Sequence, residues 1–290
     1  MKNPLFVGTC TALVTPFLNH QVNYPMLEIL LQRQIDAGIE AVVICGTTGE
    51  APTLTDAEKL ELFSRAKKYA GNSCKVIAGT GSNSTLHTIE LSKAAVQCGV
   101  DGLLIVSPYY NKATQEGLKA HYAAIAHAVE IPIVLYNVPS RTGLDIPVSV
   151  YEELCNIENV AGIKEASTDI CKTTRILRTC GNHMPVWSGN DDMTVPMMSL
   201  GAKGVISVLS NVMPLQTQAM TQAALAGDFD TAAAIQIELQ PLIELLFCEV
   251  NPIPVKAAMK IIGYDCGQCR LPLSQMDKTK HRKLEEALLS

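Results

Sequence analysis

The chain of 290 residues is 48% hydrophobic, carries a formal net charge of −5 and contains no block of basic residues. Its apolar content is sufficient for a sizeable core, and its charge argues against nucleic acid or an anionic membrane surface as partners. No apolar stretch reaches the length of a membrane-spanning helix, and the first residues lack the long apolar region of a signal peptide, so we expect a cytoplasmic protein.

Strand and helix patterns alternate from the start of the chain. Thr55 and Glu58 form a capping box for the second predicted helix. Asn23 is positioned to cap the first helix, whose apolar face repeats at helical spacing: Leu27, Leu30, Leu31 and Ile35. Short apolar runs typical of buried strands cover residues 6–14, 41–45, 76–78, 102–106, 133–136, 160–164, 186–187 and 204–208. Further helices are predicted over residues 84–98, 114–129, 169–180 and 191–200, with a short one after Pro147.

These strands, each followed by a helical segment, predict a parallel sheet covered by helices. Eight such units over about 225 residues favour an α/β fold of the (β/α)8 TIM-barrel type. The competing fold is an open doubly wound sheet. No GxGxxG motif follows the first strand, so the dinucleotide-binding version of that fold lacks support.

After the eighth strand only helices are predicted, over residues 214–226, 228–247, 253–262 and 275–289. The last three exceed what a minimal barrel needs, and no linker rich in Gly, Pro and Ser precedes them. We therefore expect a catalytic barrel over residues 1–225 and a C-terminal helical extension over residues 226–290 that packs on the barrel.

Lys164 ends a short apolar strand, and polar residues follow it at once. An ammonium group at such a position is costly to desolvate, which favours the neutral amine. A neutral amine attacks ketones and forms Schiff bases. The alternative is a lysine that extends from the strand end to solvent or pairs with Glu165.

Catalytic residues of such barrels lie where strands end and the following loops begin. Tyr136 ends the neighbouring strand and can donate and accept a proton, and Thr47 and Tyr110 can extend a hydroxyl relay from it. Arg141 can hold a carboxylate through a bidentate fork. Taken singly, each has a structural alternative: a rim aromatic, a loop cap or a solvated charge.

Metal and phosphate sites have less support. None of the six histidines lies at a predicted strand end, and Asp191 and Asp192 fit the start of a helix. The Gly79-Thr-Gly81 segment lacks the Lys-Ser/Thr ending of a P-loop. Only Cys266 and Cys269 of the ten cysteines form a CxxC, without the second pair that a zinc ribbon needs, so we expect no metal site and mostly buried free thiols.

Several segments together resemble the dihydrodipicolinate synthase family of the pyruvate-dependent class I aldolase superfamily, which also contains N-acetylneuraminate lyase. The similarity covers nearly the whole chain and is carried by these motifs: Gly46-Thr-Thr-Gly-Glu50, Pro108-Tyr-Tyr-Asn111, Tyr136-Asn-Val-Pro-Ser-Arg-Thr-Gly143, Gly162-Ile-Lys-Glu-Ala166, Ser188-Gly-Asn-Asp191 and Asn251-Pro-Ile-Pro-Val-Lys256. The lysine and tyrosine motifs are common to the superfamily, whereas the double threonine and the Pro-Ser-Arg-Thr-Gly segment are more specific to the synthase.

The resemblance implies a lyase that condenses pyruvate with L-aspartate 4-semialdehyde to 4-hydroxy-tetrahydrodipicolinate, in lysine and diaminopimelate synthesis. It implies no cofactor beyond a covalent imine of pyruvate on Lys164. By the same resemblance, Thr48, Gly189 and Ile206 line the pyruvate site, and Arg141 binds the carboxylate of the aldehyde substrate. Tyr110 is implied to reach the active site of a neighbouring subunit, so a homotetramer built as a dimer of dimers is expected.

Two other functions remain open at this point. One is a related lyase that uses the same imine chemistry on a sialic acid or a keto-deoxy sugar. The other is a non-catalytic barrel that binds a small acid.

The resemblance also bears on regulation. Lysine-inhibited members bind lysine between two subunits through a histidine, a glutamate and the tyrosine that aligns with Tyr109. Here Lys59 stands at the histidine position and His87 at the glutamate position, which implies an enzyme that lysine does not inhibit.

Overall fold

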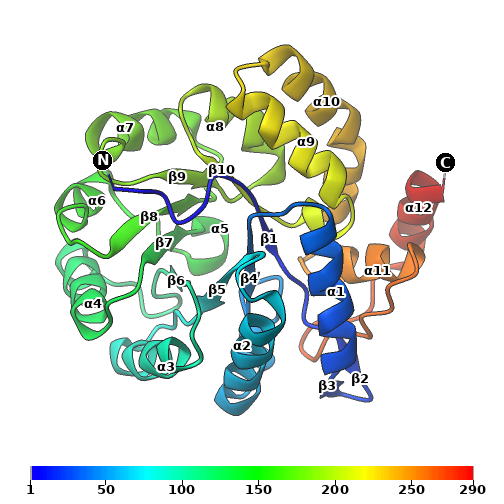
Figure 1. The fold of residues 1–290 in the computed structure, drawn as a ribbon, viewed down its shortest axis with the longest axis horizontal. Helices are drawn as coiled ribbons and strands as arrows, with labels where there is room; N and C mark the ends of the chain where they lie inside the picture. The colour runs from blue at the N-terminus through cyan, green and yellow to red at the C-terminus, as the bar shows by residue number, and fades with distance from the viewer. Residues whose placement is uncertain (1, 290) are drawn as a thin grey trace.

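The computed structural model describes residues 2–289, in which eight parallel strands close into a barrel (Figure 1). The strands follow one another around the ring in chain order, and β1 closes it by pairing with both β4 and β10. The barrel strands are β1 (Gly8–Ala12), β4 (Ala41–Ile44), β5 (Lys75–Gly79), β6 (Gly102–Val106), β7 (Ile133–Asn137), β8 (Val160–Glu165), β9 (Val186–Ser188) and β10 (Gly204–Ser207). The predicted (β/α)8 barrel is confirmed.

Helices surround the barrel as an outer ring (Figure 1). They are α1 (Tyr24–Asp36), α2 (Asp56–Ala70), α3 (Thr85–Gln97), α4 (Gln115–Ala128), α6 (Val148–Leu154), α7 (Ile170–Cys180), α8 (Thr194–Ser199) and α9 (Pro214–Leu225). The start of two of them is set by local chemistry, as predicted. The Asn23 side chain accepts from the backbone N–H of Met26, and Thr55 and Glu58 cap α2 reciprocally.

Three more helices follow the barrel: α10 (Phe229–Leu246), α11 (Ile253–Ile261) and α12 (Lys278–Leu289). Helix α10 packs on α8 and α9, and α12 packs on α10 and α11, so the helices form one layer at the side of the barrel (Figure 1). The division into a barrel to residue 225 and an extension from residue 226 stays a prediction. No helix within residues 2–289 combines the length and hydropathy that crossing a membrane requires.

The structure differs from the sequence-based prediction in several short segments. The strand predicted over residues 6–14 is shorter, since β1 spans Gly8–Ala12, and the helix predicted over 191–200 begins as a 3₁₀ turn before α8. A hairpin, β2 (Phe17–Leu18) and β3 (Gln21–Val22), and the short helix α5 (Pro139–Thr142) were not predicted. The two strands and the helix are too short to show a hydrophobic period in the sequence. The hairpin also depends on the distant Cys266, whose carbonyl accepts from Phe17 N at 2.9 Å.

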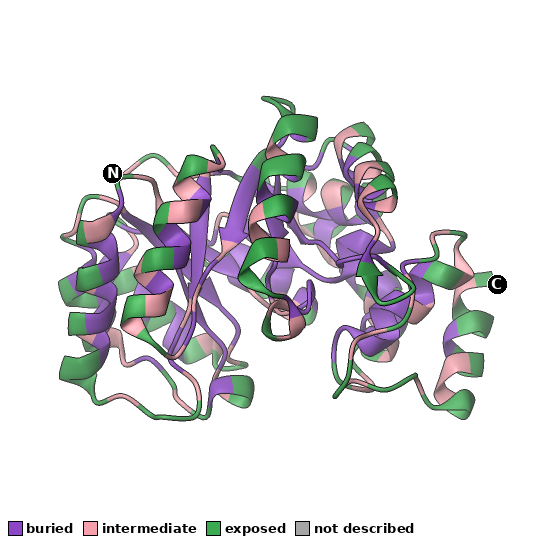
Figure 2. Ribbon diagram, turned by 90° about the horizontal axis from the view of Figure 1, so that it is seen from below, coloured by how far each residue is buried: buried purple, intermediate pink, exposed green. Residues whose placement is uncertain are grey.

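Two separate apolar cores stabilise this architecture. The larger lies between the strands and the helices, where buried residues line the inner faces of the helices (Figure 2). The smaller fills the interior of the barrel and includes Phe6, Tyr136, Trp187 and Ile206. A side chain at Gly162 would lie 2.3 Å from Trp187, so the glycine on β8 provides the room that this indole occupies.

The buried histidine of α4 generates a prediction about acid stability. His121 is 5% exposed, with Nδ1 2.9 Å from Thr85 Oγ1, and burial lowers the pKa of His121 to about 4 from its usual 6.5. The unfolded chain therefore binds this proton more readily than the folded one. The contribution of neutral His121 to the free energy of unfolding is present above pH 6.5 and is lost as the pH falls from 6.5 towards 4.

We expect His121→Asn to reduce the slope of unfolding free energy against pH in this window, by at most about 1.4 kcal/mol per pH unit. Denaturant titrations between pH 4 and 7 measure it, with His127→Asn on the exposed face of the same helix as control. Equal slopes in wild type and His121→Asn would contradict the assignment.

Candidate active site

Lys164 is buried inside the carboxyl end of the barrel. Its side chain projects from β8, the residue is 5% exposed, and Nζ lies 4.2 Å from the centroid of the Tyr136 ring. Tyr136 is the neighbour of Lys164 in the β7–β8 register and is 6% exposed. The structure therefore brings together the amine and the phenol that the sequence places at adjacent strand ends.

The surroundings of Lys164 differ from those of the other buried lysines. Lys172 pairs with Asp145 and lies 3.6 Å from Glu165, and Lys256 lies 2.8 Å from Glu50. Within residues 2–289, no carboxylate lies within ion-pair distance of Lys164. Glu165, the sequence neighbour considered as its partner, instead accepts from Asn137 Nδ2 at 2.8 Å and from Ser167 N at 2.7 Å. The nitrogen of Lys164 is therefore not held in an ion pair within the described chain, and an amine in such a position can serve as a nucleophile in Schiff-base chemistry.

Gly189 adjoins the side chain of Lys164, and Ile206 lies in the barrel-interior core; the sequence analysis assigned both to a pyruvate site. A methyl group at position 189 would lie 3.1 Å from Lys164 Cε and 2.6 Å from Ala166 Cβ. Glycine therefore keeps open the space beside the lysine chain. Ile206 is fully buried on β10 in the core that fills the barrel interior.

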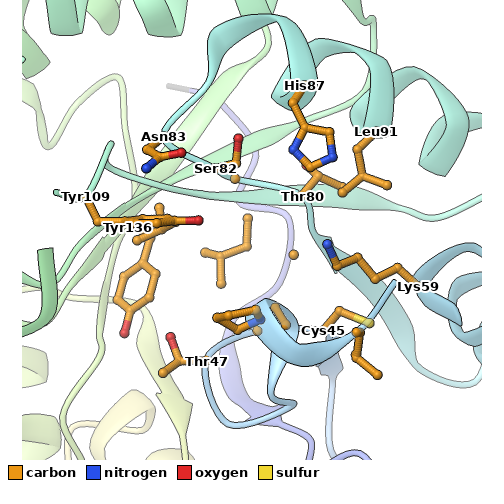
Figure 3. Close-up of a pocket in the computed structure, with 18 of the residues that line it drawn as sticks. Cys45, Thr47, Lys59, Thr80, Ser82, Asn83, His87, Leu91, Tyr109 and Tyr136 are labelled. Atoms are coloured by element: carbon orange, nitrogen blue, oxygen red, sulfur yellow. The ribbon is translucent and has the colours of Figure 1, made fainter. Parts of the chain in front are cut away.

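A pocket of about 630 Å³ opens at this end of the barrel (Figure 3). Tyr136, Thr47 and Arg141 line it, and Lys164 adjoins it through Tyr136. Figure 3 shows Tyr136 and Thr47 at one end of the pocket and Lys59 and His87 at the other. No hydrogen bond joins Tyr136 to Thr47 within the described chain, so the predicted relay is present as neighbouring hydroxyl groups and not as a closed network.

Tyr110 lies apart from these residues. It is 90% exposed, sits in a loop with a positive φ of 71°, and does not line the pocket. Within one chain the structure therefore does not bring Tyr110 to Tyr136 and Thr47. Such exposure is what a hydroxyl that serves a neighbouring subunit requires.

Sequence reasoning missed the contacts that Asn251 and Asp191 make at the site. Thr48 is 2% exposed, and its Oγ1 accepts from Asn251 Nδ2 at 3.0 Å, while the Asn251 carbonyl accepts from Arg141 Nη2 at 3.2 Å. Asn251 belongs to a quoted motif but received no role. That motif was the only signal in the sequence, because local patterns cannot reveal a contact between Asn251 and Thr48, which lie 203 residues apart.

Asp191 is the second of these residues: it begins the 3₁₀ turn Asp191–Met193, which confirms the predicted helix start, but its side chain has a further, buried role. The residue is 1% exposed, and its Oδ2 accepts from the backbone N–H of Val208 and Leu209, each at 3.0 Å. Burial raises the pKa of Asp191 above its usual value. This carboxyl holds the loop after β10, directly beyond Ile206.

The cysteines are free thiols throughout the described chain. Burial raises the pKa of Cys266 and of Cys269 to about 12, the opposite of what a reactive thiolate needs. No group of three or more His, Cys, Asp or Glu in the described part of the chain is arranged to hold a metal ion.

The fold and the site define a class: a (β/α)8 barrel that presents a buried amine, beside a phenol, at the carboxyl ends of its strands. The model of the dihydrodipicolinate synthetase family matches residues 5–290, and the chain belongs to that family. It is 46% identical over 288 residues to 4-hydroxy-tetrahydrodipicolinate synthase of Acetivibrio thermocellus, with 99% of this chain and 98% of the relative covered.

Solved structures agree. The dihydrodipicolinate synthase of Aquifex aeolicus superposes with a TM-score of 0.96 at 44% identity, covering 98% of this chain and 97% of that one. The chloride-inhibited dihydrodipicolinate synthase of Acinetobacter baumannii, complexed with pyruvate, gives 0.96 at 41% identity, with 98% of each chain covered.

The far end of the pocket generates a prediction about regulation. Asp56 lies between Lys59 and His87, with Lys59 Nζ 3.1 Å from Oδ1 and His87 Nε2 2.8 Å from Oδ2. The carboxylate is already paired, so it is not free to receive the ammonium of lysine, and Lys59 adds a like charge. Loss of a partner carboxylate weakens the binding of a lysine molecule by about a hundredfold or more.

We therefore expect lysine to leave the activity unchanged at sub-millimolar concentration. A lysine titration at sub-saturating pyruvate measures this, with arginine as the control cation. Half-inhibition by sub-millimolar lysine would show that another group compensates for these two positions.

Proposed function

We propose that this barrel condenses pyruvate with L-aspartate 4-semialdehyde to 4-hydroxy-tetrahydrodipicolinate, with Lys164 as nucleophile. The observation that carries the proposal is the buried amine of Lys164, which has no carboxylate partner in the described part of the chain and lies 4.2 Å from the centroid of the Tyr136 ring. Family membership and the names of the relatives support the same substrates.

The amine of Lys164 attacks the C2 carbonyl of pyruvate, and loss of one water gives the imine. Removal of a C3 proton then gives an enamine, whose C3 forms the new carbon–carbon bond with the aldehyde carbon of the second substrate. The amino group of that substrate attacks C2, closes the ring and releases the lysine amine. Pyruvate and the semialdehyde are thus converted to the cyclic product and one water.

The remaining site residues take roles in this sequence. Tyr136, beside Lys164, exchanges protons with the carbinolamine oxygen and C3, and Thr47 and Tyr110 extend this relay. Thr48, with Gly189 and Ile206, binds pyruvate. Arg141, exposed at the pocket wall, binds the carboxylate of the semialdehyde through its guanidinium.

The role of Lys164 can be tested by chemical trapping. We expect borohydride reduction of the imine with pyruvate to leave a 1-carboxyethyl group on the peptide that contains Lys164, attached to the lysine nitrogen. Lys164→Ala and Lys164→Arg should both abolish the adduct and lower turnover by several orders of magnitude, because a guanidinium stays protonated and cannot form the imine. Mass spectrometry of the digested protein measures the adduct.

Lys203, half-buried just before β10, provides a matched control, since Lys203→Arg makes the same replacement outside the pocket and should preserve both trapping and turnover. Normal turnover in Lys164→Arg would rule out the Schiff base. Replacing the semialdehyde by a sugar aldehyde separates the synthase from a sugar lyase, because only the true acceptor gives a condensed product.

The exposure of Tyr110 supports an assembly in which neighbouring subunits share active sites, and we propose a homotetramer arranged as a dimer of dimers. A cytoplasmic location and the absence of a cofactor remain part of this proposal.

A shared site predicts complementation between two inactive variants. Mixing Tyr110→Phe subunits with Lys164→Ala subunits should restore activity, since a hybrid contains one site with both Lys164 and an intact Tyr110. Mixing Tyr136→Phe with Lys164→Ala is the control and should restore none, because both changes fall in the site of one chain. Activity no higher than the sum of the parents, after subunit exchange verified by mass spectrometry, would count against a shared site.

A further inference from the structure

Asn251 connects the C-terminal extension to two loops that carry active-site residues. It lies between α10 and α11 and is 6% exposed. Its side-chain amide reaches Thr48 in the loop after β4, and its backbone carbonyl receives Arg141 of α5. One residue of the extension is thus in contact with side chains assigned to both substrates.

The direction of the hydrogen bond to Thr48 has a chemical consequence. Asn251 Nδ2 donates to Thr48 Oγ1, so the threonine oxygen accepts and its own proton is left for another acceptor. Within residues 2–289 no atom accepts that proton. A carboxylate is a pure acceptor, and the hydroxyl of Thr48 is therefore prepared to donate to the carboxylate of pyruvate.

The position of Asn251 does not depend on this bond alone. Lys256 of α11 lies 2.8 Å from Glu50 in the same loop as Thr48, and the other oxygen of Glu50 accepts from Arg270 N at 2.8 Å. These buried contacts already fasten the extension to the loop, so substitutions at Asn251 should leave the fold intact.

Stability does not account for the carboxamide. Among residues 2–289, Asn251 Oδ1 is buried and finds no hydrogen-bond partner, which costs stability relative to a fully satisfied group. The amide is explained by its Nδ2 group, which donates to the oxygen of Thr48.

We propose that Asn251 is a positioning residue that orients the Thr48 hydroxyl as a donor to the pyruvate carboxylate. This inference rests on the proposed function and extends it, because it makes the C-terminal extension part of the substrate site.

The decisive substitution is Asn251→Asp, which keeps the shape of the side chain and reverses its polarity. An aspartate accepts the proton of Thr48, so the hydroxyl no longer donates to the substrate, and it adds a negative charge near a bound anion. We expect the pyruvate concentration for half-maximal trapping, and KM for pyruvate, to rise about 10- to 100-fold, the effect of losing a hydrogen bond to a charged group. Thermal unfolding, measured alongside, shows whether the variant is folded at the temperature of the assay.

Asn251→Ala should raise the same concentration less than Asn251→Asp does, because the hydroxyl of Thr48 is still free to donate. In a Thr48→Val background, Asn251→Ala should add less than about a twofold further change, since the residue acts through Thr48.

The matched control is Asn159→Asp. The Asn159 amide also joins two segments, donating to Ala126 O at 2.9 Å and Val129 O at 2.7 Å, but it precedes β8 at the opposite end of the barrel. This change should lower the melting temperature and leave the pyruvate dependence of trapping unchanged.

The outcomes separate the two proposals. If the wild type forms no pyruvate adduct on Lys164, the proposed function fails and this inference fails with it. If the wild type is trapped but Asn251→Asp saturates at the wild-type pyruvate concentration, or Asn251→Ala is as impaired as Asn251→Asp, only the role of Asn251 is overturned.

Discussion

The mechanism proposed for this barrel depends on a lysine that is buried, within residues 2–289, without a carboxylate partner. Lys164, Lys172 and Lys256 are 5%, 3% and 4% exposed, and each must offset the cost of removing an ammonium group from water. Lys172 and Lys256 do so by pairing with carboxylates, which engages their nitrogens in ion pairs. Lys164 Nζ lies over the Tyr136 ring and, within residues 2–289, takes part in no ion pair, so no carboxylate engages it.

The surrounding fold holds that amine in place from both sides of the sheet. On the inner side, Gly162 admits Trp187, and the indole stacks on Phe6 with ring centroids 4.7 Å apart. On the outer side, Glu165 binds Asn137, which also accepts from Ile146 N at 3.0 Å. The strand of Lys164, the strand of Tyr136 and the loop that carries Arg141 are thereby joined by buried polar contacts.

The fold could be predicted from the sequence because its signals are local. Apolar runs mark the strands, and caps such as Thr55 with Glu58 mark where helices begin. The same holds for Lys164 and Tyr136, because a strand end fixes where a side chain lies in a parallel barrel. Asn251 and Asp191 could not be assigned this way. Asn251 acquires its role from a contact 203 residues away, and Asp191 is buried by the loop after β10.

A crystal structure of the enzyme with pyruvate tests the central claim most directly. The account predicts continuous electron density from Lys164 Nζ to C2 of pyruvate, with a carboxylate oxygen within hydrogen-bond distance of the Thr48 hydroxyl. Pyruvate bound with its ketone intact at an unmodified Lys164, or an adduct on Lys172 or Lys256, would contradict it.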